Sequence, residues 1–167
     1  MKSLRPRSVI LALLYACFLG YWVWSASQLP ERVATHFNGS GDPNGWMSRS
    51  TNQMFMLVFG LVFPLLVVLL CYLTRFLPSG LVNIPRRDYW LAPQRRKETS
   101  DYLVRHSLWF GCLAVCFVIG IQYSIVQANR LSPPHLSTMI LLALVGSFLA
   151  GTAGWVVVLF RHFRRAA

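Results

Sequence analysis

Charged residues are scarce in this chain, and acidic ones are the scarcest. Only 13% of the 167 residues are Asp, Glu, Lys or Arg, and only five are acidic, whereas 55% are hydrophobic. Soluble domains average roughly 25% charged residues. A soluble fold with this composition would expose large apolar patches to water. The composition therefore argues against a soluble protein and for one surrounded by lipid.

The few charges that are present give the chain a net charge of +11, from sixteen basic residues. In a soluble protein such an excess would favour nucleic acid as a partner. Here the basic residues occupy short segments between long uncharged runs. We therefore expect them to contact the bilayer and its anionic phospholipids, and we expect no nucleic-acid partner.

Catalytic and metal-binding patterns are also missing from the sequence. No charged residue lies in the central part of an apolar run, which argues against a pump, a coupled transporter or a charged pore. There is no phosphate-binding loop, zinc-protease signature or nucleophile elbow. The four cysteines all lie within apolar runs, so we predict neither a disulfide framework nor a metal site. We expect no enzyme activity and no cofactor.

Four uncharged stretches dominate what remains. Each contains about 20 apolar residues, the length that a helix needs to cross a bilayer, and backbone groups in lipid must be paired within the segment. The fold class that follows is all-α: a single domain over residues 1–167 forming an integral membrane four-helix bundle. We expect a structured extracytoplasmic loop between the first two helices. The helices are predicted at about 8–27, 53–74, 105–127 and 137–160.

The basic residues alternate between the two sides of such a bundle. The first segment, the middle loop and the tail carry thirteen of them: Lys2, Arg5, Arg7, Arg75, Arg86, Arg87, Arg95, Arg96, Lys97, Arg105, Arg161, Arg164 and Arg165. The other side has only Arg32, Arg49 and Arg130. Positive residues mark the cytoplasmic side. We therefore predict cytoplasmic N- and C-termini.

Small residues repeat every four positions in the first and fourth predicted helices. The first helix carries Ala12, Ala16 and Gly20, and the fourth carries Gly146, Ala150 and Gly154. Small residues at this spacing form a groove that admits another backbone. We expect the first and fourth helices to pack on each other, and a homo-oligomer seam is the alternative.

The segment between the first two predicted helices is rich in turn residues. Asn-Gly occurs at 38–39 and 44–45 with Asp-Pro at 42–43, which indicates a compact loop. Its candidate ligand-binding residues are His36, Phe37, Asn38, Asp42, Asn44 and Trp46. The alternative is that these polar side chains cap turns and bond to the loop backbone. One histidine without a second strong ligand is a poor metal site.

A second segment, on the predicted cytoplasmic side, combines basic and aromatic residues. Its candidates are Arg86, Arg87, Asp88, Tyr89, Trp90, Arg95 and Arg96. We interpret it as a lipid anchor with aromatic rings among the headgroups, and docking of a cytoplasmic protein is the alternative. A helix is predicted to start at Ala92-Pro93 and to run into the third span, with Asp101 pairing with Lys97 and Arg105 four residues away.

The loop also carries a longer motif: Leu29-Pro30-x-x-Val33-x-x-His36-Phe37-Asn38-x-x-Gly41-x-Pro43-x-Gly45-Trp46-x-Ser48-Arg49. This motif, with its flanks at about residues 12–60, resembles the signature of a bacterial membrane domain of unknown function at the N-terminus of SdpI-type immunity proteins. The resemblance implies a membrane protein with a shaped outer loop and no established catalysis. In those immunity proteins a further multi-helix portion follows, and a transcriptional repressor is thought to be held at the membrane. We expect that portion to be missing here.

The resemblance implies a bacterial inner (plasma) membrane as the location. Together with the residues it predicts a non-enzymatic protein whose outer loop binds or senses a ligand or peptide. The alternative is a structural or accessory subunit of a larger membrane complex, with a membrane protein as partner. An enzyme using His36 and Asp42 is disfavoured because no base–nucleophile pair is visible.

Overall fold

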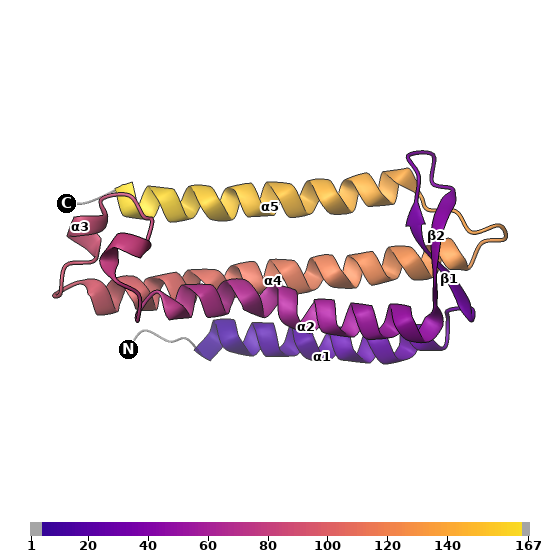
Figure 1. Cartoon of the computed structure of the whole chain (residues 1–167), viewed down its shortest axis with the longest axis horizontal. Coiled ribbons are helices and arrows are strands. Elements are labelled where there is room, and N and C mark those ends of the chain that lie inside the picture. Colours follow the sequence, from indigo (N-terminus) through magenta and orange to yellow (C-terminus); the bar gives the residue numbers. More distant parts are fainter. Residues whose placement is uncertain (1–4, 165–167) are drawn as a thin grey trace.

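The computed structural model describes residues 5–164, and Lys2 and Arg165 of the basic set lie outside the described residues. Four long helices run side by side: α1 (Arg5–Ala26), α2 (Arg49–Leu73), α4 (Arg96–Asn129) and α5 (Thr138–Arg164). The strands β1 (Arg32–Phe37) and β2 (Pro43–Ser48) lie at one end of the bundle. A 3-10 turn η1 (Ser79–Leu81) and the short helix α3 (Arg87–Trp90) lie at the other (Figure 1). We call these the hairpin end and the basic end.

All four long helices are long and apolar enough to cross a membrane, so the chain has the architecture of a multi-pass membrane protein. The structure starts α4 at Arg96, before the predicted 105. The reason lies in the preceding turn, where the Arg95 and Arg96 amides both donate to the Ala92 carbonyl at 2.9 Å. The polar segment that begins near Ala92 thus leads directly into the apolar part of α4, and the helix is continuous.

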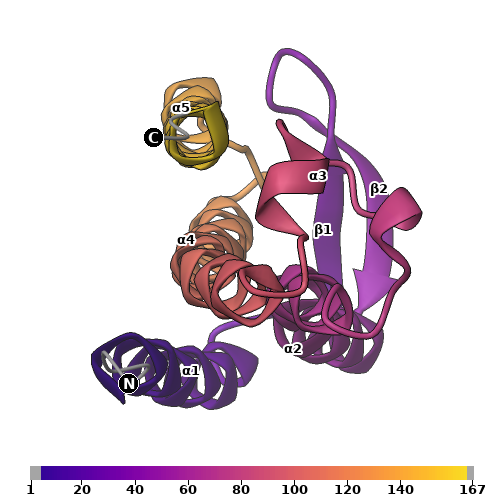
Figure 2. The same cartoon turned by 90° about the vertical axis from the view of Figure 1, so that its left-hand side faces the viewer.

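Helix α4 is the centre of the bundle. It packs against α1, α2 and α5, and Figure 2 shows it lying between α1 and α5. Val115, Val118 and Val126 of α4 are fully buried, as are Phe18 of α1 and Met56 of α2. The core therefore lies where α1, α2 and α4 meet, and α5 is outside it.

A glycine allows α1 and α2 to approach closely. The Phe18 ring lies directly over Gly60, and a Cβ atom added there would meet that ring at 2.2 Å. A side chain at position 60 would push the two helices apart. Small residues in lipid act in this way because packing must replace the hydrophobic driving force.

The predicted packing of the first helix on the fourth is wrong. Both α1 and α5 pack on α4, which separates them (Figure 2). Nothing lies within 4 Å of a Cβ added at Gly20, Gly146 or Gly154. Ala12 and Ala150 are likewise exposed. Small residues at this spacing allow another helix to pack closely against them. Among the described residues, no helix packs against these faces of α1 and α5.

A buried polar cluster joins α1, α2 and α4 near the hairpin end. Gln53 and Gln122 donate their side-chain amides to Ser25 Oγ at 3.1 and 2.7 Å, and Ser25 Oγ donates to the Trp22 carbonyl at 2.8 Å. The Trp22 indole N–H in turn donates to the Gln53 carbonyl at 2.9 Å. Hydrogen bonds between helices in lipid average about 0.6 kcal/mol each. The cluster fixes the rotation of three helices about one serine.

The connection between α1 and α2 is a short antiparallel strand pair, which the all-α prediction did not contain. Val33 pairs with Met47 and Ala34 with Trp46, and the register shifts beyond Ala34. The turn is closed by the Asn38 amide, which donates to the Asp42 carbonyl at 2.9 Å. At the far end of the pair, Ser48 Oγ accepts the Thr51 amide at 3.1 Å and caps α2.

Candidate functional site

The hairpin is held by the last turn of α4. The Ala34 amide donates to Asn129 Oδ1 at 2.8 Å, and Asn129 Nδ2 donates to the Ala34 carbonyl at 2.8 Å. A single side-chain amide therefore pairs both backbone groups of a fully buried strand residue, as a neighbouring strand would. This contact occupies the outer edge of β1 and leaves β2 as the strand farther from α4 (Figure 2).

The tip of the hairpin is held by the connection between α4 and α5. The Leu136 amide donates to the Gly41 carbonyl at 2.9 Å, and Asp42 lies 3.5 Å from His135. Gly41 has φ +90, and a Cβ there would lie 2.3 Å from the Leu136 carbonyl oxygen. Only glycine fits this position, because of both its conformation and its space. The hairpin thus contacts α4 and the segment that leads into α5.

The predicted loop residues divide into two groups. Asn38 Oδ1 accepts the Ser40 and Asp42 amides at 3.0 and 2.9 Å, so Asn38 shapes the turn as the alternative interpretation proposed. Phe37 is half-buried at the end of β1, opposite Pro43. Asp42 lies against His135. Asn38, Phe37 and Asp42 therefore contribute to the structure of the hairpin and its attachment.

The remaining predicted residues are open to contact. His36, Asn44 and Trp46 are all exposed, and Trp46 retains 39% of its accessible surface. The Arg32 guanidinium lies 5.2 Å from the centroid of the Trp46 ring. Within the described part of the chain, no three His, Cys, Asp or Glu side chains are grouped so as to hold a metal ion. One hairpin therefore presents the aromatic ring of Trp46, the guanidinium of Arg32 and the side-chain amide of Asn44.

The aromatic residues of the predicted cytoplasmic segment contact their own chain. The Trp90 indole N–H donates to the Phe163 carbonyl at 2.9 Å, and its ring lies 5.2 Å from His162 and 5.4 Å from Phe163. Tyr89 is half-buried beneath the Arg95 guanidinium at 3.8 Å. Trp90 thus joins α3 to the end of α5.

The charged residues of this segment also have partners. Arg87 and Asp88 form a salt bridge at 3.2 Å, and Arg96 donates to the Leu77 carbonyl and to Ser79 Oγ. Arg86 adopts the left-handed conformation with φ 52 before α3. Arg86, Arg87 and Arg95 are exposed, whereas Arg96 is half-buried.

The predicted pairing of Asp101 along its own helix is corrected by the structure. Asp101 forms its salt bridge with Arg75, which follows α2, at 2.9 Å. The partner comes from a neighbouring segment because α2 and α4 lie side by side.

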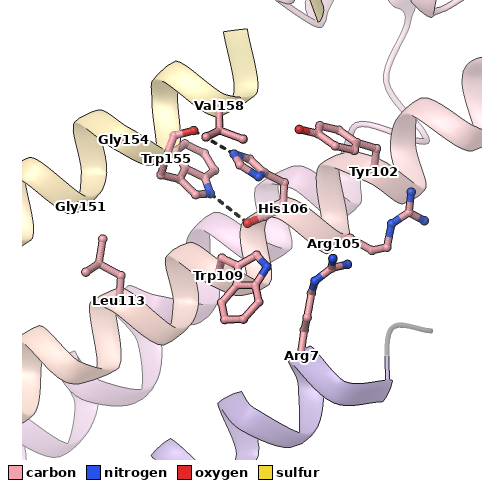
Figure 3. Close-up of a pocket in the computed structure, with 10 residues that line it drawn as sticks. All are labelled: Arg7, Tyr102, Arg105, His106, Trp109, Leu113, Gly151, Gly154, Trp155 and Val158. Atoms are coloured by element: carbon pink, nitrogen blue, oxygen red, sulfur yellow. Dashed lines mark hydrogen bonds between the residues drawn. The ribbon is translucent and has the colours of Figure 1, made fainter. Parts of the chain in front are cut away.

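A further cluster at the basic end was not predicted from the sequence. His106 Nε2 bonds to the Trp155 carbonyl oxygen at 2.9 Å, and the Trp155 indole N–H donates to the His106 carbonyl at 2.9 Å (Figure 3). Their rings stack at 4.7 Å. This reciprocal pair ties α5 to α4. The ring of Tyr102 continues the stack toward His162, at 3.6 Å.

Beside this pair lies a pocket of about 520 Å³ between α1, α4 and α5. Figure 3 shows Arg7 rising from α1 toward Trp109 on α4, with Gly154 of α5 on the opposite side. The Arg7 guanidinium lies 6.0 Å from the centroid of the Trp109 ring. Arg105, one helical turn before Trp109, also lines the pocket. Arg105 and Trp109 are four residues apart, and this spacing alone indicates that they share one face of a helix. Arg7 and Gly154 are distant in sequence, so the sequence does not show that they line the same pocket.

The hairpin lies within a stretch of the chain that matches a protein family. Residues 13–62 match a family described as a domain of unknown function (DUF1648). No curated protein and no solved structure matches the chain. The matched stretch begins in α1, contains both strands and ends in α2. The part of the chain that is similar to this family is therefore the hairpin together with the adjoining parts of α1 and α2.

Proposed function

We propose that this chain is a non-enzymatic protein of the bacterial plasma membrane that presents its hairpin outside the cell membrane to bind an extended peptide. The observation that carries the proposal is the free edge of β2. Among the described residues the sheet consists of β1 and β2 alone, and Asn129 occupies the other edge of β1. An edge without a neighbouring strand accepts an extended peptide as a further strand through its backbone groups. Asn44, Trp46 and Ser48 of β2 are exposed and alternate with half-buried residues, so one face also offers side chains to that peptide.

The distribution of basic residues supports this orientation. Eleven basic residues of the described chain belong to the basic end, and three, Arg32, Arg49 and Arg130, belong to the hairpin end. By the positive-inside rule, we infer that the basic end and with it both termini face the cytoplasm. Labelling of single cysteines at Asn44 and Arg87 in intact cells tests this placement. Labelling at 44 alone is expected, and labelling at 87 alone would reverse the orientation.

The anchoring contacts support recognition by a preformed surface. Asn129 and Leu136 hold β1 and the turn, so the hairpin is ordered before a partner arrives. A rigid surface binds with a smaller loss of conformational entropy than a mobile loop. Trp46 supplies the aromatic anchor that peptide-binding surfaces typically contain.

The test uses a photo-crosslinking residue at position 44 in the full-length protein in bacterial membranes, with mass spectrometry of the adducts. We expect a peptide adduct in the otherwise wild-type chain and its loss in Trp46→Ala. Trp24→Ala is the matched control, because Trp24 is also exposed at this end and also lies near an arginine, Arg130, at 5.3 Å. Equal adducts in both variants, or none in any chain, would overturn the proposal.

The resemblance of the hairpin motif to SdpI-type immunity proteins gives the proposal a specific form. In this form the peptide is a secreted toxin and the protein confers immunity or signals its presence. Cells expressing Trp46→Ala or His36→Ala at normal levels should then lose protection. Normal protection in both variants would exclude this role for the hairpin.

A second candidate function is that of an accessory subunit in a larger membrane complex. The specific support is α5, whose most apolar stretch has no buried residues. The face carrying Gly146, Ala150 and Gly154 is open to a helix from another protein. Purification in mild detergent distinguishes the two functions, because a subunit would co-purify with one membrane protein in fixed ratio.

A further inference from the structure

The pocket beside α4 has a cationic end and an apolar end. Arg7 and Arg105 lie at the basic end, and Leu113 and Gly151 lie deeper along the bundle. On α4, Leu113 follows Arg105 by two helical turns, which is about 12 Å of helix. The charged end of the pocket thus lies toward the membrane surface and its apolar wall lies toward the membrane centre. A bilayer lipid has the same arrangement, with a charged headgroup above apolar chains.

The geometry points to an anionic phospholipid as the occupant, with its phosphate held by Arg7 and Arg105 and one acyl chain lying along Leu113 and over Gly154. The volume of about 520 Å³ falls within the range of about 300–1,000 Å³ typical of small-molecule sites. This site is separate from the hairpin and does not depend on its proposed function.

The charges of the pocket are complementary to a phosphate. Among the described residues that line it, none is acidic. The salt bridges found between described residues involve neither Arg7 nor Arg105. His106 already bonds to the Trp155 carbonyl through Nε2, so the two arginines supply the cationic groups. Guanidinium groups bind phosphate oxygens through charge-assisted, often bidentate hydrogen bonds.

The apolar wall selects a lipid over a free phosphate ion. The pocket is lined by residues of α1, α4 and α5. Because α1 and α5 pack on α4 and not on each other, we place its mouth between those two helices, toward the surrounding bilayer. Gly154 presents no side chain, and nothing lies within 4 Å of a Cβ added there. An acyl chain can therefore lie directly against the α5 backbone. Trp109 is 46% exposed beside it, at the position that interfacial tryptophans favour.

The test measures lipid retention on the purified full-length protein by native mass spectrometry. The probes are phosphatidylglycerol and phosphatidylethanolamine with identical acyl chains, each with and without inorganic phosphate. We expect one phosphatidylglycerol to be retained at least tenfold more strongly than phosphatidylethanolamine. Inorganic phosphate at equal concentration should not displace it. Equal retention of the two lipids, or displacement by phosphate alone, would overturn the assignment.

Two pairs of variants locate the site. Gly154→Leu fills the pocket and should lower phosphatidylglycerol retention at least tenfold. Gly146→Leu is its control, because position 146 on the same helix is equally open but does not line the pocket. A similar loss in both variants would contradict an acyl-chain site over Gly154.

The second pair separates the pocket from general surface charge. Arg7→Gln combined with Arg105→Gln should abolish the preference for phosphatidylglycerol. Arg87→Gln combined with Arg95→Gln removes the same charge from exposed positions at the same end and should leave the preference intact. Equal loss in the two double variants would show attraction to the whole basic surface and would overturn the pocket as the binding site.

Discussion

Helices α4 and α5 have nearly the same hydropathy but very different surroundings. Half of the most apolar stretch of α4 is buried, whereas none of the corresponding stretch of α5 is. Helix α4 contacts three other helices and the hairpin, and α5 packs mainly against α4. Hydropathy therefore identifies a membrane span, but it does not distinguish a helix that faces protein from one that faces lipid. In lipid both surroundings are apolar, so only packing and hydrogen bonds separate them.

The same comparison explains how each helix is held. Helix α4 is fixed along its length by buried side chains such as Val115 and Val118, and by Gln122 in the serine-centred cluster. Helix α5 depends on a few directional contacts, above all the reciprocal bonds between His106 and Trp155. Substitutions in α4 should therefore affect the whole bundle, and substitutions in α5 should have local effects.

The largest expected effect comes from truncating a leucine that faces the core. Leu108 in α4 is 8% exposed, and Leu108→Ala should lower the free energy of unfolding by about 2 kcal/mol because it leaves a cavity. Leu142 in α5 is 63% exposed, and Leu142→Ala should change that free energy by less than about 0.5 kcal/mol. Reversible unfolding in lipid bicelles measures both values, and equal losses would remove the proposed distinction between the helices.

A comparable effect is expected at the end of α4 that holds the hairpin. Asn129→Ala leaves both backbone groups of the buried Ala34 unpaired, which should cost about 2 kcal/mol. Hydrogen exchange should accelerate across β1 and β2 with little change in α1. Asn129→Asp keeps an acceptor for the Ala34 amide and should show a smaller acceleration. Unchanged exchange in Asn129→Ala would mean that the hairpin is held by its turn and by α2 alone.

The spans were accessible from the sequence because lipid allows an apolar run only one common solution, a helix. The turn chemistry around Asn38 was also accessible, since an Asn side chain commonly bonds to amides two residues on. The strand pair was missed because its alternation is short. The contact of Asn129 with the edge of β1 at Ala34 joins residues 95 positions apart, so no local pattern indicates it.

Long-range pairings could not be predicted for a physical reason. A stripe of small residues such as Gly146, Ala150 and Gly154 indicates that a backbone can approach, but not which one. Trp90 is predicted to lie among lipid headgroups, and the bond of its indole N–H to the Phe163 carbonyl at the end of α5 could not be read from the sequence. The pocket likewise brings together Arg7 and Gly154, which are distant in sequence and line it from α1 and α5. The sequence shows which side chains require a hydrogen-bond or packing partner. Only the folded structure shows which residue is that partner.

A smaller effect is expected where α5 is tied to α4. Trp155→Phe keeps an aromatic ring against His106 but removes the indole N–H that donates to its carbonyl, a loss of about 1 kcal/mol. Spin labels on the two helices at the basic end should report a broader distance distribution. Trp109→Phe, at an exposed ring of the same pocket, is the control and should leave the distribution unchanged. An unchanged distribution in Trp155→Phe would mean that the stack alone holds α5.

The smallest expected effect is at the open face of α5. Ala150 is exposed between Gly146 and Gly154, so Ala150→Leu adds its side chain to lipid and should change the free energy of unfolding by less than about 0.5 kcal/mol. The same bicelle measurement applies, at two protein concentrations. A loss above about 1 kcal/mol that grows with concentration would indicate that this face packs against another copy. In that case α5 would be a buried helix like α4, with its partner supplied by a second chain, and the contrast between the two helices would hold only for the monomer.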